Sequence, residues 1–305
     1  MTRRQLLAAG TVASVATVLA TACGSNDDAG PAGPTASSEV AASSSPTSSS
    51  SASPVMDDAT MAMLDRIFAE QFAATGVAGL AGAVQIGDDE WVGSAGVADL
   101  SSGEAFRPAD FMRIASVTKT FTATAVLQLV DKGLVSLDDV LERYVPGVIN
   151  GDVATIADLL GMQSGIPDFT ANARFLDAFT ADPTMAWTER RTLDVIAEAS
   201  EADFAPGART AYCDSNFVLL GMVAEAVTGE PVGVTVTQSI IEPLGLTSTS
   251  YPTGAMVPDP HPTAYAPVLD PNDPGAPIDN VANPPRVVND VNPAVAAGAG
   301  AMIST

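Results

Sequence analysis

A serine and a lysine stand three positions apart, at Ser116 and Lys119, where a long and weakly charged stretch begins. On a helix this spacing places both side chains on one face, about one turn apart. Burial disfavours the ammonium form of a lysine, so Lys119 could accept the proton of Ser116, and a helix N-terminus favours developing negative charge. The pair is a candidate nucleophile and base. The spacing alone also fits a serine that merely starts a helix beside an incidental lysine.

The scarcity of lysine in the chain favours the chemical interpretation. Only two lysines occur, Lys119 and Lys132, and a lysine is rarely placed in so apolar a helix without a reason. The stretch 116–132 has apolar residues on all sides of the helix, so we expect it to be buried, with Gly133 ending it. The candidate site is therefore predicted on a core helix.

Other elements must position this helix. Apolar residues at helical spacing predict a first helix over 59–74, and two strand-like runs, 80–86 and 91–97, predict a hairpin that turns at Asp88-Asp89. Ser136-Leu137-Asp138-Asp139 is expected to cap a short helix ending before Pro146, and Thr155 to Asp158 to open another. A further helix is predicted over 215–228, ended by Gly229.

Composition excludes several classes of function. The 305 residues carry 13 basic and 36 acidic side chains, a net charge of -23, so nucleic acid is not an expected partner. Two cysteines and one histidine exclude a Cys/His zinc site and a disulfide framework, and we expect no metal and no cofactor. His261 lies between prolines and is expected in an exposed loop. Cys213 is expected to be a small buried thiol rather than a nucleophile.

The first 55 residues are typical of an exported protein. Arg3-Arg4 precede an uncharged stretch, and Ala20-Thr21-Ala22 forms a cleavage pattern directly before Cys23, which predicts a signal peptide over 1–22. Residues 23–55 are rich in Ser, Ala and Pro and are expected to form a tether, with Cys23 as a lipidation site. A bacterial lipoprotein signal usually has a bulky aliphatic residue where Ala20 stands, so plain secretion stays open, and a permanent membrane span is a weaker alternative.

Residues 56–305 are expected to form the globular domain, and several segments within it make an ordered set. They are Arg113-Ile114-Ala115-Ser116-Val117-Thr118-Lys119-Thr120, then Thr155-Ile156-Ala157-Asp158-Leu159-Leu160 leading to Ser164-Gly165-Ile166-Pro167, then Pro206-Gly207 leading to Tyr212, Leu219-Leu220-Gly221, and Glu242-Pro243-Leu244-Gly245-Leu246. In this order they resemble the serine beta-lactamase-related family, which includes class C beta-lactamases, D-alanyl-D-alanine carboxypeptidases, D-aminopeptidases and esterases.

The resemblance implies an α+β fold, a beta-lactamase/transpeptidase-like antiparallel sheet with a helical lobe. It also implies that Ser116 is the acylated nucleophile, Lys119 its proton acceptor, and Tyr212 the phenol that carries a proton to and from the leaving group. The backbone N–H of Ser116 would form half of an oxyanion hole. The alternative for Tyr212 is a core tyrosine with a satisfied hydroxyl.

The sequence departs from the family pattern in three places. Tyr212-Cys213-Asp214 replaces Tyr-Ser-Asn. We expect Asp214 to bind substrate, and its charge would hold Lys119 in the charged form and weaken it as a base. Alternatively, Asp214 only caps the helix from Ser215. Met162-Gln163 replaces His-Thr, which we interpret as a change in loop packing. The segment 300–305 resembles one that more helices, three strands and a third motif normally follow, so we expect a fold incomplete at the C-terminus.

These observations predict an exported serine hydrolase of the cell envelope, lipid-anchored to the outer face of the cytoplasmic membrane. Its expected activity is D-alanyl-D-alanine carboxypeptidase-like or beta-lactamase-like, on a small molecule or a peptidoglycan stem peptide. The alternatives are a short-chain esterase of the same fold and a catalytically inactive binding lipoprotein.

Overall fold

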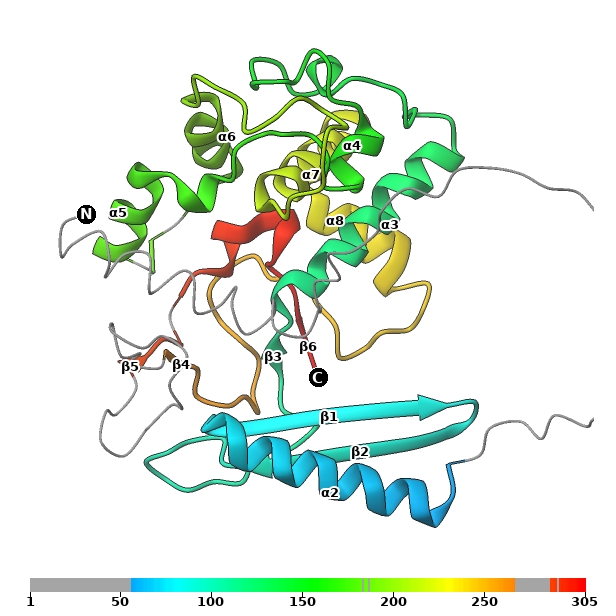
Figure 1. The fold of residues 1–305 in the computed structure, drawn as a ribbon, viewed down its shortest axis with the longest axis vertical. Coiled ribbons are helices and arrows are strands. Elements are labelled where there is room, and N and C mark those ends of the chain that lie inside the picture. The colour runs from blue at the N-terminus through cyan, green and yellow to red at the C-terminus, as the bar shows by residue number, and fades with distance from the viewer. Residues whose placement is uncertain (1–55, 183, 186, 267–285, 290) are drawn as a thin grey trace, which may run out of the picture.

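The computed structural model describes residues 56–182, 184–185, 187–266, 286–289 and 291–305. The predicted signal peptide 1–22 and the tether 23–55, with Cys23, lie outside the described residues. The described chain forms a helical part and, beside it, a layer made of one helix and a hairpin (Figure 1).

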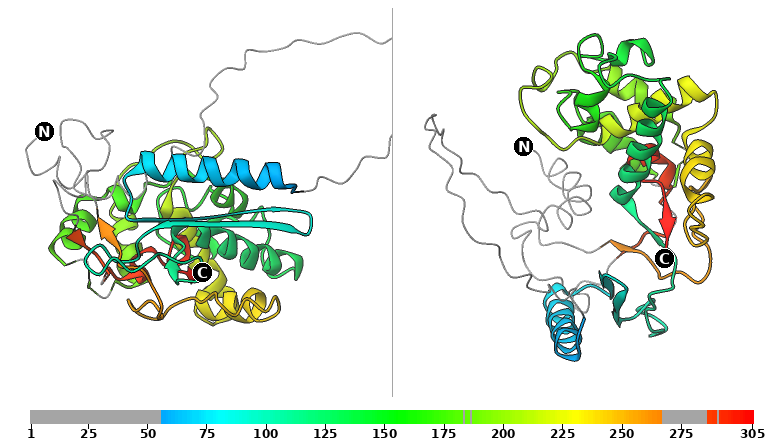
Figure 2. Two further views of the ribbon diagram at one scale, coloured as in Figure 1. Left: turned by 90° about the horizontal axis from the view of Figure 1, so that it is seen from below. Right: turned by 90° about the vertical axis from the view of Figure 1, so that its right-hand side faces the viewer.

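The N-terminal layer consists of helix α2 (Asp58–Thr75) on a hairpin of β1 (Gly79–Ile86) and β2 (Asp89–Gly96). Figure 2 shows the helix lying along one face of the hairpin. The side chain of Trp91 joins the two, because its ring packs edge-on against Phe68 and its Nε1–H donates to Asp65 at 2.9 Å. The predicted helix and hairpin are confirmed. The turn comes one residue earlier than expected, at Gly87-Asp88, because Gly87 adopts the positive φ of +62° that the turn requires.

Helix α7 (Asp214–Thr228) is the centre of the helical part. Its residues 215–221 are all buried, and Gly229 ends it in a left-handed conformation, as predicted. Around α7 lie helices α3, α4, α5, α6 and α8, with α8 continuing into a π-helical turn. Their bounds are Thr118–Asp131, Ile156–Leu160, Ala173–Ala181, Glu189–Ala197 and Val232–Val236, and the turn is Thr237–Ile241. A 3-10 segment, Pro293–Ala299, packs on both α3 and α7.

The remaining strands pair segments that are far apart in the sequence. Strand β3 (Met112–Arg113) pairs antiparallel with β6 (Ile303–Ser304), and β4 (Tyr265–Ala266) with β5 (Arg286–Val287). The predicted α+β class is confirmed, and the antiparallel pairing among the described residues is divided over three two-stranded ladders. No single described helix is long and apolar enough to cross a membrane; α7 with the segment Val232–Ile241 meets that test only as a pair, bent by 81°.

Two predictions about helices need correction. The helix of the Ser116 stretch begins only at Thr118, after a 3-10 turn over Ala115–Val117, and it is not buried all round, since Val117 is 51% and Leu127 43% exposed. The covered face is the one toward α7, α8 and the segment Pro293–Ala299. The capping box at Thr155 is confirmed as the start of α4.

The short helix predicted from Ser136 does not form. Instead, the carboxylate of Asp139 closes a turn by accepting the backbone N–H of Ser136 at 2.8 Å and the hydroxyl of Tyr144 at 2.6 Å. A 3-10 turn over Leu141–Arg143 follows. An Asp side chain that bonds to nearby donors competes with helix formation, which explains the difference.

Gly165 lies in the loop between α4 and the next turn, where the backbone crosses the loop that contains Phe204. Its φ is +66°, and a Cβ atom there would lie 1.9 Å from the carbonyl oxygen of Phe204. The Asn150 side chain donates to the carbonyls of both Ser164 and Phe204 at 2.9 Å, which holds the two loops together. The close approach therefore requires a residue without a side chain.

We expect Gly165→Ala to destabilise the protein more than Gly207→Ala. Gly207 has a similar φ of +76° but open space around it, so both variants carry the cost of a left-handed alanine, about 1 kcal/mol. Only Gly165→Ala adds a backbone clash, which should cost about 2 kcal/mol more. Denaturant unfolding of both variants and the unchanged protein measures the difference, and equal losses would contradict the close approach.

Candidate active site

Lys119 lies in the first turn of α3, and its ammonium group is buried. Its Nζ donates to Ser116 Oγ at 3.0 Å, to Asp214 Oδ1 at 2.6 Å and to the carbonyl of Ala299 at 2.8 Å. An ammonium group has three N–H donors, and these three acceptors use all of them. The lysine is therefore satisfied in its charged form, in contact with three separate segments of the chain.

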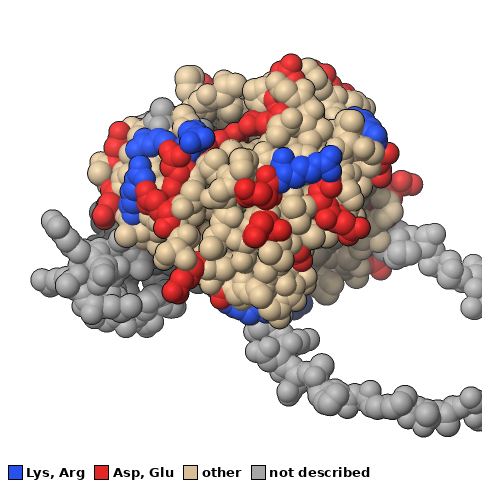
Figure 3. Space-filling model, turned by 90° about the horizontal axis from the view of Figure 1, so that it is seen from above, with Lys and Arg blue, Asp and Glu red and all other residues tan. Residues whose placement is uncertain are grey.

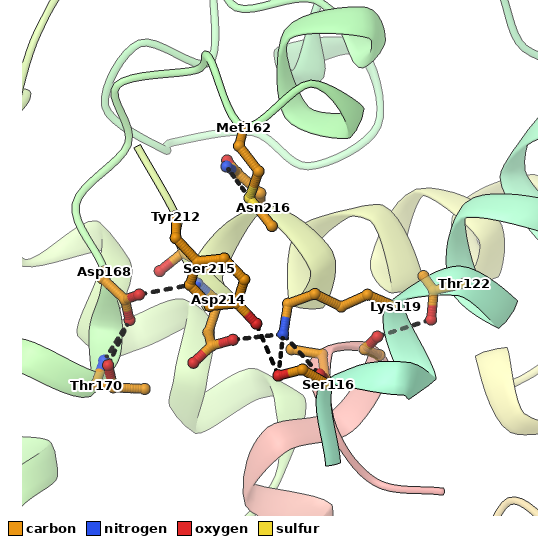
Figure 4. A network of polar contacts seen from close by, with 12 residues as sticks. Ser116, Lys119, Thr122, Met162, Asp168, Thr170, Tyr212, Asp214, Ser215 and Asn216 are labelled. Atoms are coloured by element: carbon orange, nitrogen blue, oxygen red, sulfur yellow. Dashed lines mark hydrogen bonds and ion pairs between the residues drawn. The ribbon is translucent and has the colours of Figure 1, made fainter. Parts of the chain in front are cut away.

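Ser116 is placed by the 3-10 turn that precedes α3. Its Oγ accepts hydrogen bonds from Lys119 Nζ and, at 2.7 Å, from the hydroxyl of Tyr212 (Figure 4). Ala115, directly before it, has a φ of +43°, a conformation that alanine rarely adopts and that the surrounding structure must enforce. Among the described residues the backbone N–H of Ser116 has no acceptor, so it is available to a ligand.

Tyr212 is not a core tyrosine. The residue is 60% exposed, and its hydroxyl points at Ser116 from the chain segment just before α7. Its ring lies over Lys119, with the Nζ atom 4.9 Å from the ring centre. The three side chains predicted to form the site, Ser116, Lys119 and Tyr212, therefore lie in contact, although they come from positions up to 96 residues apart.

Asp214 is the first residue of α7, and its side chain does not cap that helix. One carboxylate oxygen contacts Lys119, and the pair is partly buried, with 8% of the lysine and 28% of the aspartate side chain exposed. Burial raises the pKa of Asp214, the charge of Lys119 lowers it, and the charge of Asp168 raises it again, with a net increase. Of the two interpretations left open by the sequence, contact with Lys119 is the one observed.

Asp168 is the residue that caps α7 in place of Asp214, and the sequence did not reveal it. Its Oδ2 accepts the backbone N–H of Asp214 at 2.9 Å, while Oδ1 accepts the N–H and the hydroxyl of Thr170 at 2.8 and 2.7 Å. The Asp-x-Thr spacing after Pro167 is typical of such a turn and was the available signal. Its contact with α7 links residues 46 apart, which no local pattern predicts.

Cys213 and His261 are separate from this network. Cys213 is buried, its Sγ donates to the carbonyl of Ile166 at 3.3 Å, and burial, as the largest cause, raises its pKa to about 12. Its thiol stays protonated at neutral pH and is a poor nucleophile. Nδ1 of His261 lies 3.0 Å from a carboxylate oxygen of Asp259, and the histidine side chain is 29% exposed, which makes it more covered than predicted. Within the described residues no three His, Cys, Asp or Glu side chains are grouped as metal ligands would be.

The arrangement has the parts that acyl transfer to a serine requires. A hydroxyl lies within hydrogen-bond reach of an amine and a phenol, either of which can exchange a proton with it. The unpaired N–H of Ser116 can donate to an oxyanion. Tyr212 and Val117 are exposed beside Ser116, so the hydroxyl lies where a substrate can reach it.

Comparison with known proteins identifies similar chains. The model of the family described as Beta-lactamase matches residues 64–305, which is more than half of the chain. Among curated proteins, penicillin-binding protein 4 of Amycolatopsis lactamdurans is 34% identical over 176 residues, 56% of this chain. A D-aminopeptidase of Brucella anthropi is 30% identical over 164 residues, 54% of this chain. The matched segments span only 44% and 30% of the lengths of these two relatives.

A solved structure extends the similarity over most of the chain. The D-stereospecific amidohydrolase from a Streptomyces species has a TM-score of 0.67 and 36% sequence identity. The superposition covers 81% of this chain and 68% of that one. The fold of the described residues is therefore that of known amidohydrolase structures.

We expect Asp168→Asn to lower the pKa of Asp214. The negative charge of Asp168 raises that pKa, and asparagine removes the charge while its amide oxygen can still accept the N–H of Asp214. Titration of the Asp214 carboxyl by NMR or infrared spectroscopy, in both proteins, measures the shift. An unchanged or higher pKa in the variant would show that the charge of Asp168 does not reach Asp214.

Proposed function

The chain belongs to the Beta-lactamase family, and from this premise we propose that it is an exported serine hydrolase that forms an acyl-enzyme on Ser116. The observation that carries the proposal is the pair of contacts at Ser116 Oγ, 3.0 Å from Lys119 Nζ and 2.7 Å from the hydroxyl of Tyr212. A serine placed between an amine and a phenol is the arrangement of an activated nucleophile.

The first half of the reaction transfers the acyl group to Ser116. After Lys119 has released one proton to solvent, its neutral amine takes the hydroxyl proton of Ser116 while Oγ forms a bond to the substrate carbonyl carbon. The carbonyl oxygen becomes an oxyanion, which the N–H of Ser116 can stabilise. The bond to the leaving nitrogen or oxygen then breaks as Tyr212 donates its proton to that atom, and the proton taken by Lys119 restores the phenol.

The second half releases the acid. A water molecule attacks the ester carbon, and one of its protons passes through the same amine and phenol to Ser116 Oγ as the ester bond breaks. The products are a carboxylic acid and the free serine, so the atoms balance as a hydrolysis. No other reactant is needed.

We propose an amide carbonyl of D-amino acid derivatives as the target. The similar proteins bear the names of a penicillin-binding protein, a D-aminopeptidase and a D-stereospecific amidohydrolase. These names support substrates built from D-amino acids over short acyl esters. A carboxypeptidase-like action on stem peptides and a beta-lactamase-like action both fall within this class. Short acyl esters are the alternative substrate.

We expect a fluorescent penicillin to label the 305-residue chain covalently at Ser116. Intact mass spectrometry should give one adduct on the unchanged protein and none on Ser116→Ala. Cys213→Ala is the matched control, since its buried thiol should not react, and it should be labelled like the unchanged protein. Label lost from Cys213→Ala and kept on Ser116→Ala would make the thiol the nucleophile and overturn the proposal.

If none of these proteins is labelled, hydrolysis of short-chain esters and of D-amino acid amides decides between the remaining possibilities. Turnover that depends on Ser116 retains the serine hydrolase. Absence of both label and turnover favours the inactive binding lipoprotein.

We further propose that the protein is held at the outer face of the cytoplasmic membrane through a lipid on Cys23. The support is the sequence pattern around Ala20-Thr21-Ala22-Cys23 and the long tether that would separate the domain from the membrane. This location would bring the domain near peptidoglycan.

We expect Cys23→Ser to move the protein from the membrane fraction to the soluble fraction when it is expressed in a bacterium that lipidates its exported proteins. Lipid chains anchor a protein because their burial in the bilayer is favourable, and serine cannot carry a thioether-linked lipid. Cell fractionation with detection of the folded domain measures the change. Equal membrane retention of both proteins would contradict the anchor.

A further inference from the structure

We propose that Asp214 makes the site specific for substrates that carry a free amino group next to the scissile carbonyl, which the aspartate binds as an ammonium ion. The inference rests on the proposed function, because it concerns the same site and the same nucleophile. It favours aminoacyl amides and esters over substrates whose nitrogen beside the carbonyl is acylated, such as stem peptides and penicillins, which react with the same Ser116 more slowly.

The first support is the geometry of the Asp214 carboxylate. One oxygen is bonded to Lys119, while the other points away from the lysine (Figure 4). The aspartate side chain is 28% exposed and Lys119 only 8%, so the carboxylate is the more accessible member of the pair. A carboxylate has only acceptor atoms, so the group it binds must be a donor such as an ammonium ion.

The second support is position. Ser116 Oγ and Asp214 Oδ1 both contact Lys119 Nζ, at 3.0 and 2.6 Å, so the nucleophile and the carboxylate are neighbours. In an aminoacyl substrate a single carbon atom separates the amino nitrogen from the carbonyl carbon. A substrate whose carbonyl is attacked by Ser116 can therefore place its amine against Asp214.

The third support is charge. Besides the phenol of Tyr212, the ionisable groups that hydrogen bond in the network of Figure 4 are one cation, Lys119, and two carboxylates, Asp168 and Asp214. With all three ionised, the network has one excess negative charge, which attracts an ammonium ion and repels a substrate carboxylate. The net charge of the whole chain, -23, also attracts cations and repels anions. Acidic side chains are spread over the face shown in Figure 3.

The test compares D-phenylalanine p-nitroanilide with its N-acetyl derivative, which has the same leaving group and no charge. For the unchanged protein near neutral pH, we expect kcat/KM to be about 100-fold higher for the free amine. The N-acetyl derivative has no ammonium group, so it leaves the partly buried carboxylate of Asp214 without that partner. In Asp214→Asn this ratio should fall to less than about tenfold. Above about pH 8, where an α-amino group loses its proton, the preference of the unchanged protein should also decline.

Two variants serve as controls. Asp138→Asn removes one charge from an exposed turn outside the network and should keep the full preference. Ser116→Ala should hydrolyse neither substrate. Because Asp214→Asn could also disturb Lys119, the ratio between the two substrates is the decisive quantity rather than either rate alone.

Each outcome has a distinct meaning. Equal kcat/KM for the two anilides in the unchanged protein would overturn the inference and leave the serine hydrolase standing. An equal loss on both substrates in Asp214→Asn would overturn it as well, since Asp214 would then only position Lys119. Failure of both substrates together with absence of penicillin labelling on Ser116 would contradict the proposed function itself.

Discussion

A buried ammonium group must be surrounded by acceptors, and in this protein that requirement fixes the geometry of the site. The side chain of Lys119 is 8% exposed, and its three acceptors come from the turn before α3, from the start of α7 and from Ala299 near the end of the described chain. Leaving any N–H of a buried cation unpaired is costly. The three segments therefore meet at one atom, and the nucleophile candidate is located by the same contacts that satisfy the charge.

Polar contacts with the loop that follows α4 hold the start of α7 in place. Ser164 donates to Asn216 at 2.5 Å, Ser215 donates to the carbonyl of Pro167 at 2.8 Å and accepts the N–H of Phe169, and Asp168 accepts the N–H of Asp214. These groups are largely buried, so each is satisfied only when the loop and the helix keep this arrangement. Asp214 is thus presented to Lys119 by a rigid support, and the apolar remainder of α7 anchors that support in the core.

The sequence predicted the parts of the site that depend on local spacing and missed those that depend on tertiary contact. Ser116 and Lys119 are one turn apart, α4 begins at a capping box and α7 ends at Gly229, so these features follow from near neighbours. The role of Asp168 depends on α7, 46 residues away, and was not predicted. The helix expected from Ser136 failed because the Asp139 side chain has partners in its own turn. Burial of the α3 stretch was overestimated because composition shows how apolar a helix is and not which of its faces is covered.

The aspartate at position 214 gives the site two properties that an amide side chain would not combine. Its charge offsets that of the buried Lys119, with which it forms an ion pair at 2.6 Å. Burial disfavours the charged carboxylate and raises the pKa of Asp214, whereas the charge of Lys119 lowers that pKa. The attraction between the two charges thus opposes the cost of removing both from water. Because the carboxylate is the more exposed member of this pair, it can also accept an ammonium group from a substrate that reaches Ser116.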